Sequence, residues 1–277
     1  MPYPTSCWSE FPVDLIINTM GFMMPHEILV LRKVSQSIAH ITRERSVWID
    51  ALRRLSLKHG IYTPSFPLTA MTLDELEHAA TACRRFSARL RHKFIQPNDS
   101  LLSPIASQFI EATRPGEDFD HLRFLPGGRF LVTTFGCTLR LWDLGTTPTN
   151  AKLNPIASFE LEGVTDIQSV RTRASNSSSE ALLIVSTTES QSVFRVYIFT
   201  IYPPASNPKF TLFAPILTLP MDGRYPNIIG ATSQHVSIST ASSMVIWDFI
   251  ADSWSSWPSK PSLHDKGCDP RQPLFLS

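Results

Sequence analysis

The sequence of 277 residues has no long hydrophobic run and few cysteines. No apolar stretch approaches the roughly 20 residues that a membrane-spanning helix needs. The segment from Met1 to Ser6 lacks the basic start and apolar middle of a secretory signal. The cysteines form no CxxC pair and are too sparse for a disulfide framework, so we interpret them as buried or inert thiols. They are Cys7, Cys83, Cys137 and Cys268. These absences predict a soluble protein of the cytoplasm, the nucleus or both.

Motifs of enzyme chemistry are also missing. The sequence contains no HExxH, no GxSxG and no phosphate-cradling glycine loop, and its eight histidines show no metal-ligand spacing. Asp143 and Asp248 could be read as paired carboxylates. Because each follows a tryptophan, turn capping or packing is the better interpretation. We therefore predict no catalytic residue, no metal and no cofactor, and an enzyme is the least favoured alternative.

Charge and hydrophobicity indicate a folded chain with two unlike parts. Hydrophobic residues make up 43% and charged residues 18%, which permits a packed core. The net charge of +1 gives no case for binding nucleic acid or membranes. Residues 1–97 hold 12 basic and 8 acidic residues, whereas residues 98–277 hold 13 and 16. This split predicts two regions with different surfaces.

The first 97 residues have the pattern of helices. Pro12 and Pro25 each fit the first turn of a helix, where a missing N–H costs nothing. A third short helix is expected at 38–41, and a fourth from a Ser46 cap to a stop at Gly60. Residues 72–95 predict the longest helix, which opens with a Thr72–Glu75 capping box. We interpret its basic end as a spacer or docking helix, since cations there complement the helix dipole.

The first 55 residues carry an ordered set of motifs. Phe-Pro-Val-Asp-Leu-Ile-Ile at 11–17 is followed by Met-Pro-His-Glu-Ile-Leu-Val-Leu at 24–31, then Val-Ser-Gln at 34–36 and Val-Trp-Ile-Asp-Ala-Leu at 47–52. In this order and spacing the set resembles an F-box, over residues 9–55. Phe11 stands where that family usually has leucine, and the acidic residue after the proline is shifted to Asp14.

The resemblance implies a partner. F-boxes dock onto the Skp adaptor of SCF (Skp–cullin–F-box) ubiquitin ligases through an apolar face that the module leaves unburied. A module this small cannot bury so many apolar groups alone, which favours a partner over a plain core. The residues that match positions forming or supporting that face are Phe11, Pro12, Leu15, Pro25, Ile28, Leu29, Leu31, Val34 and Trp48.

The second half contains a repeat. Leu-Arg-Leu-Trp-Asp-Leu at 139–144 aligns with Phe-Arg-Val-Tyr-Ile-Phe at 194–199 and Met-Val-Ile-Trp-Asp-Phe at 244–249. Each segment follows another β-rich run, at 129–134, 182–187 and 235–240. Paired strands that end in Trp-Asp resemble WD repeats, whose usual period is about 40–45 residues. The signature residues are Trp142, Asp143, Tyr197, Trp247 and Asp248.

The length of the repeat region limits the number of blades. Residues 119–258 suffice for about three blades, whereas closed propellers usually need at least four. We therefore expect an α+β multidomain chain: an F-box at 9–60, a helical linker at 61–97, an incomplete WD-like propeller at 105–258, and an irregular tail at 259–277.

The function expected from these features is substrate recognition without catalysis. The F-box would bind the Skp adaptor, and through it a cullin ligase, while the repeats bind a protein substrate. Arg140 and Arg195 occupy equivalent repeat positions and are candidate contacts for a phosphorylated segment. One alternative is a propeller-type interaction scaffold whose F-box-like helices pack internally and never meet the adaptor. Another is a shortened copy that binds the adaptor but captures nothing.

Overall fold

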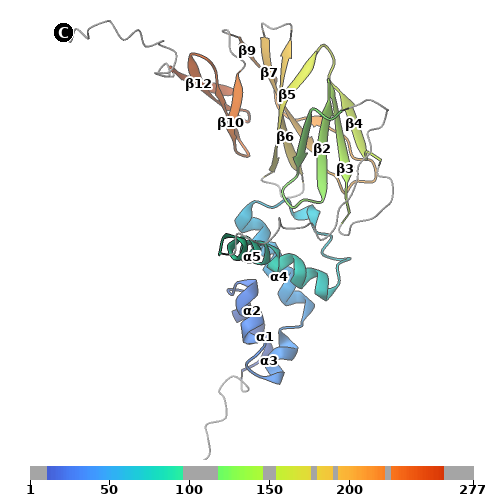
Figure 1. The fold of residues 1–277 in the computed structure, drawn as a ribbon, viewed down its shortest axis with the longest axis vertical. Coiled ribbons are helices and arrows are strands. Elements are labelled where there is room, and N and C mark those ends of the chain that lie inside the picture. The colour runs from blue at the N-terminus through green and yellow to red at the C-terminus, as the bar shows by residue number, and fades with distance from the viewer. Residues whose placement is uncertain are drawn as a thin grey trace, which may run out of the picture.

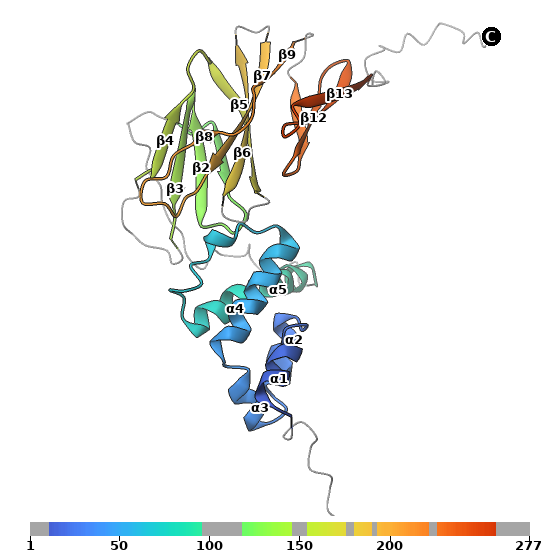
Figure 2. The same cartoon turned by 180° about the vertical axis from the view of Figure 1, so that it is seen from behind.

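The computed structural model describes residues 11–95, 118–145, 154–175, 180–189, 193–221 and 226–258. A helical module lies at one end of the molecule and three β-sheets lie at the other (Figures 1 and 2). Part of the expected repeat region, at 105–117, the expected tail at 259–277, and Cys7 and Cys268 fall outside the described residues. None of the described helices is long and apolar enough to cross a membrane.

The helical module comprises five α-helices and one short 3-10 turn, and the sequence anticipated most of their limits. Pro25 is the first residue of its helix, Gly60 ends another in the left-handed conformation, and Thr72 and Glu75 form the expected capping box. Ser46 is not a cap, because its helix already starts one residue earlier behind Glu44. The elements are α1 (Val13–Met20), α2 (Pro25–Leu31), α3 (Gln36–Ile41), α4 (Arg45–His59), η2 (Thr63–Ser65) and α5 (Leu73–Ile95).

The module has its own core around Trp48. This indole is fully buried, donates from Nε1 to the Thr42 carbonyl at 2.8 Å, and lies under the Arg32 guanidinium. Arg32 also pairs with Glu77, which ties α2 to α5. Burying an indole of this size with its polar N–H satisfied is a large stabilising term. The described part of α5 buries little beyond Leu76 and Ala80, and Cys83, expected as a buried or inert thiol, is exposed.

Three antiparallel sheets follow the helices. The first sheet has the order β1-β2-β3-β4, the second β5-β6-β7-β8 with β9 also paired to β7, and the third β10-β11-β12-β13. The strands of the first sheet are β1 (His121–Phe124), β2 (Phe130–Phe135), β3 (Thr138–Asp143) and β4 (Ala157–Glu160). Those of the second are β5 (Asp166–Ala174), β6 (Ala181–Glu189), β7 (Val193–Ile201), β8 (Thr211–Leu212) and β9 (Leu217–Pro220). Those of the third are β10 (Asn227–Ala231), β11 (His235–Ser239), β12 (Ser243–Asp248) and β13 (Ser253–Pro258).

The sheets pack face to face like the blades of a partial propeller. The second sheet lies in the middle and shares one apolar cluster with the first sheet and another with the third. Its β5 strand contacts both β1 and β10, so the leading strands of the three sheets lie side by side. Among the described strands, no pairing joins the third sheet back to the first. The expectation of about three blades in an open array is confirmed.

The predicted repeat coincides with the third strand of each sheet. Trp142, Tyr197 and Trp247 lie in β3, β7 and β12, and all three are buried. Tyr197 faces the first sheet and Trp247 faces the second, so each aromatic packs toward the preceding blade. Trp142 sits on the face of the first sheet that has no preceding blade, where Phe119 packs against its edge.

The Trp-Asp carboxylates have structural roles, as predicted. Asp143 accepts from Arg129 Nη2 at 2.7 Å and from the Gly145 amide at 2.9 Å. These bonds hold the pKa of Asp143 below its ordinary value, although burial acts in the opposite direction. Asp248 caps its turn by accepting from two backbone amides, which lowers its pKa in the same sense. Both residues fix turns at the ends of their strands.

Candidate functional site

The helical module presents an apolar face along α1 that the rest of the chain leaves open. Helical periodicity splits α1 into two sides. Ile16 and Met20 point into the module core, whereas Phe11 and Leu15 are about half exposed on the outer side. Phe22, just after the helix, is 93% exposed. Large apolar side chains gathered in this way indicate a contact surface rather than scattered surface residues.

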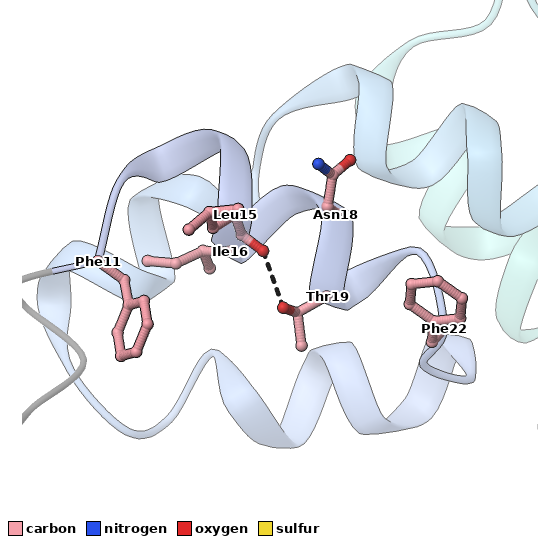
Figure 3. A pocket seen from close by; sticks show the side chains of 6 residues that line it. All are labelled: Phe11, Leu15, Ile16, Asn18, Thr19 and Phe22. Atoms are coloured by element: carbon pink, nitrogen blue, oxygen red, sulfur yellow. Dashed lines mark hydrogen bonds between the residues drawn. The ribbon is translucent and has the colours of Figure 1, made fainter.

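This face is hollowed rather than flat. A depression of about 420 Å³ lies among the α1 side chains, and its lining is mostly apolar (Figure 3). The Thr19 hydroxyl on its rim donates to the Leu15 carbonyl at 2.8 Å. That bond satisfies the hydroxyl within the helix and leaves the hollow apolar. The lining residues are Phe11, Leu15, Ile16, Asn18, Thr19 and Phe22.

The nine residues implied by the resemblance fall into three groups. Phe11, Pro12, Leu15 and Val34 are exposed, Leu29 and Leu31 are half-buried, and Pro25, Ile28 and Trp48 are buried. The buried three belong to the module or lie against it, so they are placed to support the face rather than to present it. Pro25 is buried as the first residue of α2.

Further exposed apolar residues extend the face, and motif matching did not identify them. Val13, Phe22, Met24 and Val30 are exposed on or beside α1 and α2. A helical hydrophobic pattern identifies apolar residues but not which of them remain uncovered after packing. The sequence does hold one signal of such exposed residues. The first two predicted helices carry more apolar residues than a single buried face of each helix can accommodate.

Backbone carbonyls behind the face are held by arginines. Arg54, on α4, donates to the Met20 and Met23 carbonyls at 3.2 and 3.1 Å, where α1 ends. Arg45 donates to the carbonyls of Leu68, Thr69 and Met71, on the segment that leads to α5. The Arg54 contacts fix the end of α1 against α4 and so preorganise the face, whereas the Arg45 contacts tie the start of α4 to the segment before α5.

The connector between helices and sheets is itself part of the β core. Tyr62 is fully buried and meets the Phe130 ring edge-on at 6.2 Å. Its backbone amide donates to the Pro126 carbonyl at 2.9 Å, and the Ser65 hydroxyl donates to the same oxygen at 3.2 Å. Burial raises the pKa of Tyr62, which keeps its phenol neutral. The sequence placed this segment only within the predicted helical linker at 61–97.

The two candidate substrate contacts occupy equivalent positions. Arg140 lies in β3 and Arg195 in β7, each half-buried in the third strand of its sheet. Arg140 is on the outer face of the first sheet, whereas Arg195 is on the side of the second sheet that faces the first. Arg195 therefore lies at the junction of the first two sheets, whereas Arg140 lies on the far side of the first sheet. Among the described residues, no cluster of three or more His, Cys, Asp or Glu side chains could hold a metal ion.

Comparison with protein families identifies the helical module. Residues 8–50, which contain α1 to α3 and the start of α4, match the family model described as the F-box domain. No WD-repeat family match accompanies the three sheets. Comparison with curated proteins gives no match. The chain thus contains an N-terminal F-box domain, followed by three antiparallel sheets in a partial propeller.

Proposed function

We propose that this protein is a non-catalytic substrate-recognition subunit of an SCF-type ubiquitin ligase. In this role the F-box binds the Skp adaptor, and the β region binds a protein substrate. The observation that carries the proposal is the coincidence of the F-box match with the open apolar face of α1. Such a subunit works by position: it raises the local concentration of a substrate near the ubiquitin-charged enzyme.

The adaptor contact is assigned to the exposed members of the set. Phe11, Leu15 and Phe22 border the hollow, and Val34 is exposed in the turn that follows α2. When the adaptor covers this exposed apolar area, water is displaced from it. The binding free energy becomes more favourable by about 25 cal/mol per Å² of apolar area buried. Trp48 and Ile28 act indirectly, because they hold α1 and α2 in place.

The geometry also bears on the scaffold alternative, in which the helices pack onto the sheets. Trp48 is buried, as that alternative requires, but within the core of the helical module. The helical region reaches the sheets through the Tyr62–Ser65 segment, which contacts Pro126 and Gly127. The α1 face stays exposed. This arrangement favours an external partner for α1.

The connection at Tyr62 supports a fixed relation between the two ends of the molecule. A subunit that presents a substrate to a distant enzyme gains from such rigidity, because fewer orientations compete with the productive one. Which surface of the sheets takes the substrate is part of the proposal, with Arg140 and Arg195 as its candidate contacts. Localisation to the cytoplasm, the nucleus or both belongs to the same proposal.

The test is co-purification of the full chain with the Skp adaptor. Leu15→Asp, on the α1 face, is expected to abolish the complex, because it places a charge in the apolar contact. Leu57→Asp is the matched control, since Leu57 is 75% exposed on α4, away from the hollow. No complex with the unaltered chain, or equal binding by both variants, would contradict the proposal.

A further inference from the structure

A cleft lies where the helical module meets the first sheet, and its volume is about 470 Å³. The helix α5 lies between the first three helices and the sheets, and one of its faces borders this cleft (Figures 1 and 2). The connector before α5 and the turns that adjoin β2 and β3 provide the remaining lining. Its walls include Phe66, Met71, Ala79, Ala82 and Gly128.

The face of α5 that borders the cleft differs from the face that packs into the helical module. Leu76 and Ala80 are buried in the module core. Steps of three and four residues along the helix connect a second set of side chains, which begins at the cleft and continues beyond it. We call this set the cleft stripe, and its members are His78, Ala79, Ala82, Arg85, Phe86 and Arg89. Phe86 is 61% exposed, so the chain leaves this part of the stripe uncovered.

The charge of α5 changes along its length. Glu75, which borders the cleft, accepts from the Thr72 amide and is engaged in the helix cap. From residue 78 to residue 95 the sequence holds five Lys and Arg residues and no Asp or Glu. Arg89 is exposed, and it has no ion-pair partner among the residues that the structure describes. The far end of the cleft stripe therefore offers positive charge to an acidic partner.

A second arginine of the stripe, Arg85, is held in place by His78, which lines the cleft. Arg85 Nη2 donates to the His78 carbonyl at 2.9 Å, and Nη1 contacts the ring atom Nδ1. Because a guanidinium group can only donate, Nδ1 is the acceptor in this contact. The two bonds use two of the five guanidinium N–H groups and leave the others for a carboxylate. Arg85 is thus preorganised beside the cleft.

The cleft and the stripe together have the size of a short peptide site. Phe66 and Met71 provide apolar side chains, whereas a Cβ at Gly128 would meet no atom within 4 Å, so the volume beside them stays open. Ala79 and Arg89 are ten residues apart on α5, which is about 15 Å at a rise of ~1.5 Å per residue. An extended chain covers that length with about five residues. One apolar side chain in the cleft would therefore place its neighbours along the arginines.

We propose that the cleft and the cleft stripe bind a short acidic segment of a protein substrate, with one apolar side chain in the cleft and carboxylates on Arg85 and Arg89. Complementary charge selects the acidic flanks, and the apolar walls select the side chain between them. A nucleic acid fits less well, because the stripe offers only the Phe86 ring for stacking and the chain has a net charge of +1. This inference deepens the proposed function and rests on it, since it assigns the segment to a substrate.

The test is fluorescence anisotropy of a labelled peptide, a leucine with three acidic residues on each side, titrated with the full chain at physiological salt. Binding is expected, and Arg89→Glu should weaken it about tenfold, because an attraction is replaced by a repulsion. Arg53→Glu is the matched control. It makes the same change of charge at an exposed position of α4, outside the cleft and the cleft stripe, and should leave the affinity unchanged.

Two further comparisons test the cleft itself. The same peptide with alanine in place of leucine should bind about tenfold more weakly, because it buries less apolar area. Ala82→Phe leaves the charge unchanged but fills the cleft, so it should reduce the affinity for the leucine peptide to that for the alanine peptide. Circular dichroism verifies that each variant is folded.

Several results would overturn the proposal. They are no binding of the leucine peptide by the unaltered chain, equal binding by Arg89→Glu and Arg53→Glu, equal binding of the two peptides, and an Ala82→Phe variant that binds like the unaltered chain. Tighter binding of a single-stranded RNA of the same length would also overturn it, because the site would then belong to nucleic acid. The assay contains no adaptor, so its failure is distinguishable from failure of the chain to co-purify with the Skp adaptor.

Discussion

The two regions of this molecule bury their tryptophans by different kinds of packing. The F-box forms a core around Trp48 from its own helices and leaves an apolar face exposed on α1. The sheets bury Trp247 only because the second sheet lies against the third. The F-box thus completes its core from its own helices and leaves apolar side chains exposed. Each sheet completes its core only against a neighbouring sheet. The comparison teaches that apolar side chains stay exposed beside a complete core in the F-box, where we propose the adaptor contact, whereas the core at each sheet junction is shared by two sheets.

Removing the two tryptophans tests this comparison with the largest expected effects. Trp48→Ala and Trp247→Ala should each lower the free energy of unfolding by about 3–5 kcal/mol, because both indoles are fully buried. Urea denaturation followed by circular dichroism measures the loss. The consequences should differ: Trp48→Ala releases the support of α1 and weakens adaptor binding, whereas Trp247→Ala leaves adaptor binding intact. Equal effects on binding would show that the regions are not independent in this sense.

Two neighbouring glycines test how the regions are joined. Gly127 and Gly128 both have positive φ, so alanine is strained at either position. A methyl group at Gly127 would also clash with Ser65, whereas at Gly128 it would meet open space. Gly127→Ala should therefore cost about 1–3 kcal/mol more than Gly128→Ala. It should also speed proteolysis between α4 and α5. Identical melting temperatures and cleavage rates in the two variants would show that the Tyr62–Ser65 segment does not hold the two regions together.

The Arg129–Asp143 ion pair allows the stability of the β region to be tested alone. Because the folded state lowers the pKa of Asp143, its contribution to stability is present above the ordinary carboxyl pKa of about 4. That contribution is lost as the pH falls through the lower folded value. Asp143→Asn should cost about 1–2 kcal/mol at pH 7 and reduce the acid-dependent loss of stability. Thermal melts from pH 7 to pH 3 measure both, and an unchanged pH profile would contradict the assignment.

The smallest expected effect concerns the start of α5. The Thr72 hydroxyl accepts from the Glu75 amide, and the Glu75 carboxylate accepts from the Thr72 amide, which lowers the pKa of Glu75. Thr72→Ala should lose about 1 kcal/mol of helix stability. Thr69→Ala, nearby but outside the helix, is the control. Amide hydrogen exchange in the first turn of α5 reports the change, and equal exchange in both variants would show that the cap contributes nothing.

Local rules predicted much of the fold and less of the site. Pro25, Gly60 and the Thr72 capping box marked helix ends because each acts on its own backbone. The aligned Trp and Tyr segments found the third strand of every sheet. The strands β4, β5, β8, β9, β10 and β13 were not predicted, because they lie outside the aligned segments and their β conformation depends on pairing with neighbouring strands.

The exposed apolar face of α1 could not be predicted residue by residue from the sequence. Leu15 and Ile28 both match the F-box pattern, yet one is half exposed and the other fully buried. The difference is set by how α1 packs on α3 and how α2 packs on α4 and α5, which sequence spacing does not specify. Tyr62 was missed for a related reason: its partner Phe130 lies 68 residues away, and no local pattern signals such a contact.

The most direct test of the central claim is the hydrogen-exchange footprint of the Skp adaptor on the full chain. The account predicts that the adaptor slows exchange in residues 11–34, which span α1, α2 and the turn between them, and leaves the exchange of the three sheets unchanged. Protection confined to the sheets, or no protection anywhere at saturating adaptor, would contradict the assignment of the α1 face as the adaptor-binding surface.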